Sequence, residues 1–176
     1  MALLDILLEG DSRLRQKAVR VRAVDDSLRR LADDMYETMM DAPGIGLAAP
    51  QVGVLRRLIW VHVPAGYHDT NEAECSLAIV NPEIVKAQGR SLAFEGCLSI
   101  PGWTGEVPRA ETITVKGLGL DNRPLRIKSR GWAARVIQHE IDHLDGILFL
   151  DRVEDRSTIM QVPEDDAADA PGEAAD

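Results

Sequence analysis

The chain has 176 residues, of which 45% are hydrophobic and 28% charged, a balance typical of one globular domain with a sizeable core. No run of 18 apolar residues occurs, and the first residues lack the basic segment of a signal peptide, so neither a membrane span nor export is predicted. The net charge of −9 argues against a nucleic-acid-binding surface, which requires a basic stripe. We therefore expect a cytoplasmic protein in which Cys75 and Cys97 are reduced thiols.

Much of the negative charge lies in the last part of the chain. Residues 163–176 carry six carboxylates and no basic side chain, and without them the net charge is only −3. A segment of this composition cannot bury enough apolar surface to offset the entropy lost when it is ordered. We therefore predict one domain over residues 1–153 and an acidic, disordered tail over residues 154–176. A tail that binds a partner is the alternative.

The first regular element that the sequence predicts is a helix over residues 25–41, where apolar residues recur at a spacing of three and four. Asp26 or Ser27 can cap its start, and a Pro-Gly pair ends it. A glycine-rich loop, GIGLAAPQVG, follows over residues 44–53. The segment 58–63, LIWVHV, is rich in branched and aromatic residues and predicts a strand.

The middle of the chain has the pattern of short antiparallel strands. A polar stretch, PAGYHDTNEAEC, precedes them as a surface loop, and Gly, Pro and Asn separate one strand from the next. A last helix is predicted over residues 132–144, stopping near Gly146. One early helix, short strands and one late helix indicate an α+β domain. The strand candidates are 77–80, 83–87, 91–94, 112–116 and 125–128.

The last predicted helix contains the sequence His139-Glu140-Ile141-Asp142-His143. Residues four apart lie one turn above each other, so both imidazoles project from one face toward a common point. Such a pair can bind a divalent cation, which leaves Glu140 beside it as a candidate general base. The alternative is an amphipathic helix that carries two histidines by chance, because this pattern also arises in unrelated proteins.

A metal site needs a third protein ligand, and its identity separates the classes of enzyme. One large group of metalloproteases has a further histidine where this chain has Phe149, which cannot coordinate. Another group uses a glutamate on a following helix, but the acidic residues after the motif lie in a region that predicts strand and loop. Cys97 is the better candidate, because it follows a strand and a thiolate is a strong ligand for zinc or ferrous iron. For Cys75 we keep the more common interpretation, a small buried hydrophobe.

Three motifs resemble the signature motifs of peptide deformylases, in the same order and at similar separations. They are GIGLAAPQ at residues 44–51, EGCLS at 95–99 and QHEIDHLDG at 138–146, and the opening ILLEGDSRLR also resembles the usual start of that family. The likeness covers roughly residues 5–153. It implies short antiparallel strands packed around a C-terminal metal-binding helix. It also implies an enzyme that removes the formyl group from the N-terminal formylmethionine of newly made proteins and releases formate.

The resemblance implies a role for each motif residue. Cys97, His139 and His143 correspond to the metal ligands, with water in the fourth position, an open site of the kind that a catalytic metal needs. Ferrous iron is the metal that the family favours, although zinc, nickel and cobalt accept the same ligands. The partners expected are N-formylmethionyl nascent peptides near the ribosome, with no direct nucleic acid and no membrane, and the chain is expected to be a monomer.

The chemistry implied by the resemblance involves three further residues. Glu140 would take a proton from the attacking water and hand it to the leaving amine. The side-chain amide of Gln51 and the backbone N–H of Leu98 would donate to the oxygen on which negative charge develops. A tight turn would explain the glycines of the first motif, but it would not require the glutamine.

Candidates for substrate binding lie in the glycine-rich loop and on the last helix. Glycines let the backbone pass close to a substrate, and helical spacing places three residues on the side of the histidines. Ordinary core packing is the alternative for Trp132 and Val136. Trp132, Arg135 and Thr104 stand where many members have leucine, an aliphatic residue and arginine, which leaves the shape of the pocket open. The candidates are Gly44, Ile45, Gly46, Trp132, Arg135 and Val136.

Three other functions are alternatives to deformylation. A peptidase acting on internal bonds is disfavoured by Phe149 and by the lack of a second downstream helix. A closed structural metal site would leave Glu140 and Gln51 without a role. A deformylase-like protein with an altered substrate is the third, on account of the departures named above.

Overall fold

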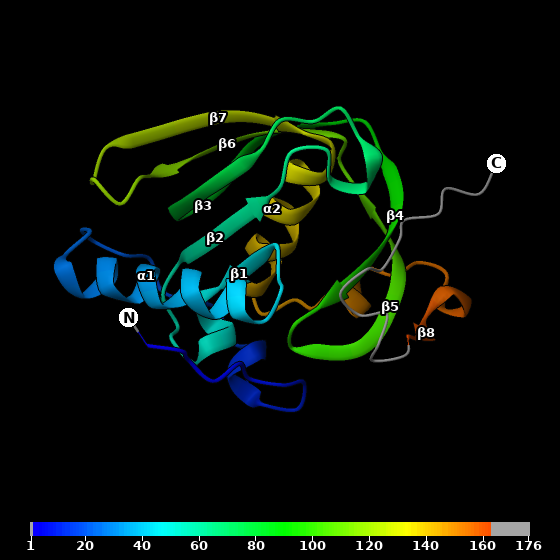
Figure 1. Cartoon of the computed structure of the whole chain (residues 1–176), viewed down its shortest axis with the longest axis horizontal. Helices are drawn as coiled ribbons and strands as arrows, with labels where there is room; N and C mark the ends of the chain where they lie inside the picture. The colour runs from blue at the N-terminus through cyan, green and yellow to red at the C-terminus, as the bar shows by residue number, and fades with distance from the viewer. Residues whose placement is uncertain (1, 163–176) are drawn as a thin grey trace.

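The computed structural model describes residues 2–162, which form two α-helices and two antiparallel sheets (Figure 1). Within that range neither helix is long and apolar enough to cross a membrane. The helices are α1 (Asp26–Asp41) and α2 (Gly131–Leu144), and short 3-10 turns are η1 (Ser12–Arg15), η2 (Ala49–Val52), η3 (Tyr67–Asp69), η4 (Phe149–Asp151) and η5 (Arg156–Thr158). The strands are β1 (Gly46–Ala48), β2 (Leu58–Val63), β3 (Cys75–Gln88), β4 (Ser91–Cys97), β5 (Ile100–Arg109), β6 (Thr112–Leu118), β7 (Pro124–Arg130) and β8 (Met160–Gln161).

The larger sheet has the strand order β1-β2-β3-β6-β7 and lies between the two helices (Figure 1). Side chains of β2 alternate between its faces, because successive residues of a strand point to opposite sides. Ile59 and Val61 pack in the cluster of α2, whereas Leu58 packs in the cluster of α1. The smaller sheet, β4-β5-β8, curves along the other side of α2. Helix α2 is therefore buried between the two sheets, and the prediction of an α+β fold with short antiparallel strands around the C-terminal helix is confirmed.

Helix α1 forms where the sequence predicts it, but its cap is a different residue. The carboxylate of Asp25, not that of Asp26 or the hydroxyl of Ser27, accepts a hydrogen bond of 2.8 Å from the backbone N–H of Leu28. Asp25 has extended backbone angles, which let its side chain fold back over the first turn.

The structure differs from the sequence predictions at three places in the sheets. The glycine-rich segment is not a simple loop, because Gly46–Ala48 pairs with β2 and the following residues form η2. The candidates 77–80 and 83–87 are one strand, β3, whose register shifts next to Asn81 at a φ of 53°. Strand β5 was not predicted, because two prolines and two glycines interrupt its pattern.

The folded part continues beyond residue 153, where the sequence analysis placed the start of the tail. Strand β8 pairs antiparallel with β5, and the backbone N–H of Val162 donates to the Gly102 carbonyl at 2.9 Å. The Thr158 hydroxyl accepts a hydrogen bond of 3.1 Å from the backbone of Glu106. The rest of the predicted tail, residues 163–176, lies outside the described residues.

Two truncations separate these segments. Ending the chain after Val162 should leave the free energy of unfolding nearly unchanged, because residues 163–176 have a composition unsuited to packing. Ending it after Val153 should cost about 2 kcal/mol, because it removes several hydrogen bonds that contribute ~1 kcal/mol each. Urea unfolding of both proteins and the full chain measures the difference. Equal stability of all three would show that β8 contributes nothing, and a loss after Val162 would mean that the tail docks on the domain.

Candidate metal centre

The three candidate ligands lie on two different elements of the fold. Cys97 is the last residue of β4, at the tight turn into β5, where it pairs with Ile100. His139 and His143 lie one turn apart on α2 and are both buried. The fold thus brings together the thiol and the two imidazoles that the motifs predict as ligands, with their ligand atoms within 4.8 Å of one another.

The donor atoms face one another at distances that suit a shared cation. The Nε2 atom of His143 lies 3.3 Å from Cys97 Sγ and 3.3 Å from His139 Nε2. Imidazole nitrogens and a soft sulfur form a ligand set for zinc or ferrous iron. Burial lowers the pKa of His143 well below its usual value, aided by the neighbouring His139, which favours the neutral imidazole that coordinates metals. The residues present therefore fit one divalent cation.

Glu95 orients the first histidine, a role that the sequence analysis did not assign. Its Oε2 atom lies 2.9 Å from His139 Nδ1, so the opposite nitrogen of the ring, Nε2, turns toward the other ligands. Burial opposes ionisation of Glu95, but its bonds to His139 and Arg109 outweigh this effect and hold its pKa well below the usual range. The sequence feature that could have pointed to this role is the place of Glu95 in the EGCLS motif, two residues before Cys97.

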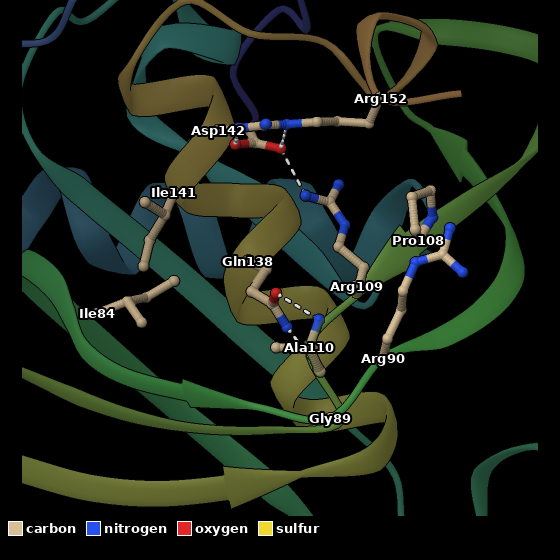
Figure 2. A pocket seen from close by; sticks show the side chains of 10 residues that line it. All are labelled: Ile84, Gly89, Arg90, Pro108, Arg109, Ala110, Gln138, Ile141, Asp142 and Arg152. Atoms are coloured by element: carbon tan, nitrogen blue, oxygen red, sulfur yellow. Dashed lines mark hydrogen bonds and ion pairs between the residues drawn. The ribbon is translucent and has the colours of Figure 1, made fainter. Parts of the chain in front are cut away.

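Asp142 joins the same ion network through Arg109, and Figure 2 shows its carboxylate between Arg109 and Arg152. Its carboxylate accepts hydrogen bonds from Arg109 at 2.5 Å and from Arg152 at 2.7 Å. These three side chains border a cavity of about 360 Å³, and none of the three ligand candidates lines it. The cavity is therefore separate from the metal centre, although Arg109 both lines the cavity and binds Glu95 beside the candidate ligand His139.

Glu140 follows His139 on α2 and has one carboxylate oxygen without a hydrogen-bond partner in the described chain. It is only 3% exposed, and its Oε2 atom has no hydrogen-bond partner within residues 2–162. Burial raises its pKa to about 7. Gly46 of β1 passes so close that a Cβ there would lie 2.3 Å from Glu140 Oε1. The glycine thus leaves room for the carboxylate.

Gln51 presents its amide to the same centre from η2. Its Oε1 atom accepts from the backbone N–H of Ala48 at 2.8 Å, which determines which way the amide faces. Its Nε2 atom donates to Ser99 Oγ at 3.2 Å and, over a long 3.6 Å, toward Cys97 Sγ. Leu98 lies in the turn between β4 and β5, directly after Cys97. Both predicted donors are therefore next to the thiol.

The predicted substrate-binding residues fall into two groups. Ile45, Trp132 and Val136 belong to one apolar cluster, in which the ring of Trp132 meets that of Tyr67 edge-on at 5.4 Å. Gly44 approaches Leu98, whose Cδ1 atom would lie 2.7 Å from an added Cβ. The first motif and α2 are therefore adjacent, as a pocket built from both requires.

Arg135 and Thr104 lie in surroundings that the sequence did not predict. The guanidinium of Arg135 is buried in the ion network and donates to Glu95 at 2.8 Å, so its charged end is not on an open pocket wall. The Thr104 hydroxyl donates to the Glu95 carbonyl at 2.9 Å and is buried as well. Phe149, which cannot coordinate a metal, is buried, and its ring stacks on that of His139 with the ring centres 6.3 Å apart.

A thiol and two imidazoles that could hold a cation, with a buried carboxylate on the same helix, are groups that a metal-dependent hydrolase uses to activate water and move its proton. The protein is a metal-dependent hydrolase. A model of the family "Polypeptide deformylase" matches residues 3–158. Peptide deformylase of Thermomicrobium roseum is 56% identical over 166 residues, covering 94% of each chain. The chain belongs to the polypeptide deformylase family, and it removes the formyl group from N-terminal methionine.

Solved structures agree with this assignment. Peptide deformylase from Ehrlichia chaffeensis is 39% identical with a TM-score of 0.83, covering 89% of this chain and 91% of that one. A class I type b peptide deformylase from Acinetobacter baumannii, solved with Met-Ala-Ser bound, is 37% identical with a TM-score of 0.81. That match covers 86% of this chain and 99% of the other. Each of these matches therefore covers most of this chain.

The space beside Glu140 can be tested with a single methyl group. Gly46→Ala would place a carbon 2.3 Å from Glu140 Oε1 and 2.8 Å from Val136 Cγ1, so the carboxylate must shift. We expect kcat/KM for formate release to fall by up to ~10²-fold, the effect of a displacement of about 1 Å. Gly119→Ala is the matched control, because its added carbon would lie 2.8 Å from Asp121 Oδ1, on an exposed side chain outside the ligand cluster. A folded Gly46→Ala enzyme with the activity of the parent would contradict the close approach.

Proposed function

We propose that Cys97, His139 and His143 bind one divalent cation, and that Glu140 moves the proton during deformylation. The observation that supports the proposal is the buried Oε2 atom of Glu140, which lacks a hydrogen-bond partner in the described part of the chain. A buried polar atom without a partner costs free energy, so its retention calls for an explanation. A substrate water held between this oxygen and the cation would provide the missing partner.

The cation, when bound, supplies Lewis acidity that makes water acidic enough to attack the formyl carbon near neutral pH. Glu140 accepts the proton of that water and delivers it to the amine nitrogen as the bond between carbon and nitrogen breaks. Formate and a free N-terminal amine are the products. Burial suits this task, because a carboxylate removed from solvent can hold a proton between the two steps.

Gln51 and Leu98 stabilise the charge that develops on the formyl oxygen. The amide of Gln51 is held by Ala48 and Ser99, so its nitrogen does not need to reorganise during the reaction. Its long contact to Cys97 Sγ leaves an N–H group that can donate to the substrate instead. Fixed donors of this kind are worth a few kcal/mol each, about 2.7–4 kcal/mol in measured cases.

The methionine side chain of the substrate would lie against Ile45, Trp132 and Val136, with Gly44 and Gly46 admitting the peptide. Support comes from their common cluster and from the contact between Gly46 and Val136. The Acinetobacter baumannii relative was solved with Met-Ala-Ser, a peptide that begins with methionine. Arg135 is left out of this pocket because its guanidinium is bonded elsewhere.

The metal we propose is Fe²⁺, with Zn²⁺, Ni²⁺ or Co²⁺ as alternatives that the same ligands accept.

We further propose that the protein works as a cytoplasmic monomer on N-formylmethionyl nascent peptides near the ribosome. Support for a reducing compartment comes from the two cysteines, which are both free thiols. Burial also raises the pKa of Cys75, consistent with the apolar role predicted for it.

Cys97 can be tested as a ligand by replacement with Ser. The change exchanges a soft thiolate for a hydroxyl that is hard to ionise, so metal affinity should fall sharply. Cys75→Ser is the matched control, because this thiol packs at the core and is absent from the ligand cluster. Metal content after anaerobic purification is the measurement. Full occupancy with unchanged activity in Cys97→Ser would remove this residue from the ligand set.

Glu140→Gln tests the proton transfer itself. Glutamine keeps the size of the side chain but cannot accept the proton, so the variant should bind metal like the parent and lose ~10²–10⁴ in formate release. Formyl-Met-Ala-Ser is the substrate, and iron is measured in the same anaerobic samples. Activity within a few-fold of the parent would show that another base does the work. Loss of metal together with activity would make Glu140 a ligand and reopen the assignment of Cys97.

A further inference from the structure

Arg135 connects the elements that carry the two halves of the metal centre. It lies on α2, one turn before His139, and is only 5% exposed. Its Nη2 atom donates to the backbone carbonyl of Ser91 at 2.9 Å and to the Ser91 hydroxyl at 3.1 Å. Its Nη1 atom donates to the Val107 carbonyl at 2.8 Å. One side chain therefore joins α2 to both β4 and β5.

The same guanidinium also holds the carboxylate that orients His139. Glu95 Oε1 accepts from Arg135 Nη1 at 2.8 Å and from Arg109 Nε at 2.9 Å. Glu95 Oε2 accepts from Arg109 Nη2 at 2.9 Å and faces His139 Nδ1. The two oxygens thus have different partners, and only Oε2 is directed at the histidine. Without Arg135, one of the two donors to Oε1 and the bridge to β4 and β5 would be lost together.

We propose that Arg135 is a positioning residue of the metal centre. It clamps the helix that carries His139 and His143 to the strand that carries Cys97, and it keeps Glu95 oriented against His139. The inference rests on the proposed ligand set. Such a clamp matters because three donors must converge within a few tenths of an ångström before a cation is bound. Arg is suited to it, because its planar fork can engage several acceptors at once.

A purely structural ion pair is the competing explanation, and the chain offers a matched control for it. Arg57 also binds α2 through a partly buried guanidinium, which donates to the Leu144 carbonyl at 3.3 Å and to Asp145 at 2.8 Å. It contacts the end of the helix and not the network around Glu95. Arg57→Met and Arg135→Met should therefore both lower stability, but only the second should alter the metal centre.

The probe is Co²⁺, added to metal-free full-length protein and measured by chelator competition and by its visible absorption spectrum. Arg135→Met is expected to bind Co²⁺ about tenfold or more weakly, within the ~10–100-fold range for residues behind metal ligands. Its spectrum should change, because the histidine and the thiolate no longer meet in one geometry. Arg57→Met should match the parent in both measurements. Unchanged Co²⁺ affinity and spectrum in folded Arg135→Met would overturn the proposal.

Two further variants make the result decisive. Arg135→Lys keeps the charge but lacks the fork, so it should give an intermediate affinity, and it replaces Arg135→Met if the latter does not fold. Parent-like affinity in Arg135→Lys would reject the clamp. His139→Ala tests the ligand set independently. If His139→Ala binds Co²⁺ as tightly as the parent, the proposed ligands are wrong; if it loses Co²⁺ while Arg135→Met does not, only the role of Arg135 fails.

Discussion

An ionised carboxylate that is almost fully buried needs opposite charges and a full set of hydrogen bonds, and Glu95 has both. Arg109 and Arg135 supply the opposite charge, and His139 supplies the remaining donor. Burying such ions is expensive unless their hydrogen bonds are complete, which they are here. The same bonds specify how β4, β5 and α2 meet. The requirement to satisfy one buried charge therefore also sets the relative positions of the proposed ligands.

Helix α2 serves as core and as chemical site along the same 14 residues. Ala134, Ile137 and Ile141 pack in the apolar cluster beneath the larger sheet. The polar and charged side chains of the helix, such as Arg135 and His139, are buried as well. Because the helix lies between two sheets, nearly all of its side chains are buried, including those that carry charge. Ordinary amphipathic patterning would leave a solvated face, so this helix needs the ion network to satisfy its polar side.

Local patterns were enough to predict one part of the centre. The spacing of His139 and His143 dictates a shared face on any helix, and motif resemblance was needed to add Cys97, which lies 42 residues earlier. Both are brought together in the structure. The surroundings of Arg135 could not be predicted in this way. Its partners lie on β4 and β5, and no local pattern states which strands will lie beside a helix.

The fold shows the same division between local and tertiary information. Helix α1 has a clear apolar period, and its prediction is confirmed to within a residue. Strand β5 contains Pro101, Gly102, Gly105 and Pro108, residues that disfavour strands, yet it is held by pairing with β4 along its length. Strand β8 has only two residues and no detectable pattern, so its place depends wholly on the edge that β5 offers.

The buried polar atoms that lack a hydrogen-bond partner in the described chain lie in the His-Glu-Ile-Asp-His motif of α2. Two buried side-chain atoms have no hydrogen-bond partner in the described chain, Glu140 Oε2 and His143 Nδ1, and both belong to the same short motif. Each such atom costs about 1–3 kcal/mol when buried, so chance is a poor explanation for finding both there. Folding alone would favour a partner for the carboxylate of Glu140. The proton transfer that we propose for Glu140 would require the opposite, an oxygen left free for water. The ion pairs of Arg109 and Arg135 hold the helix in place while that oxygen has no partner in the described chain.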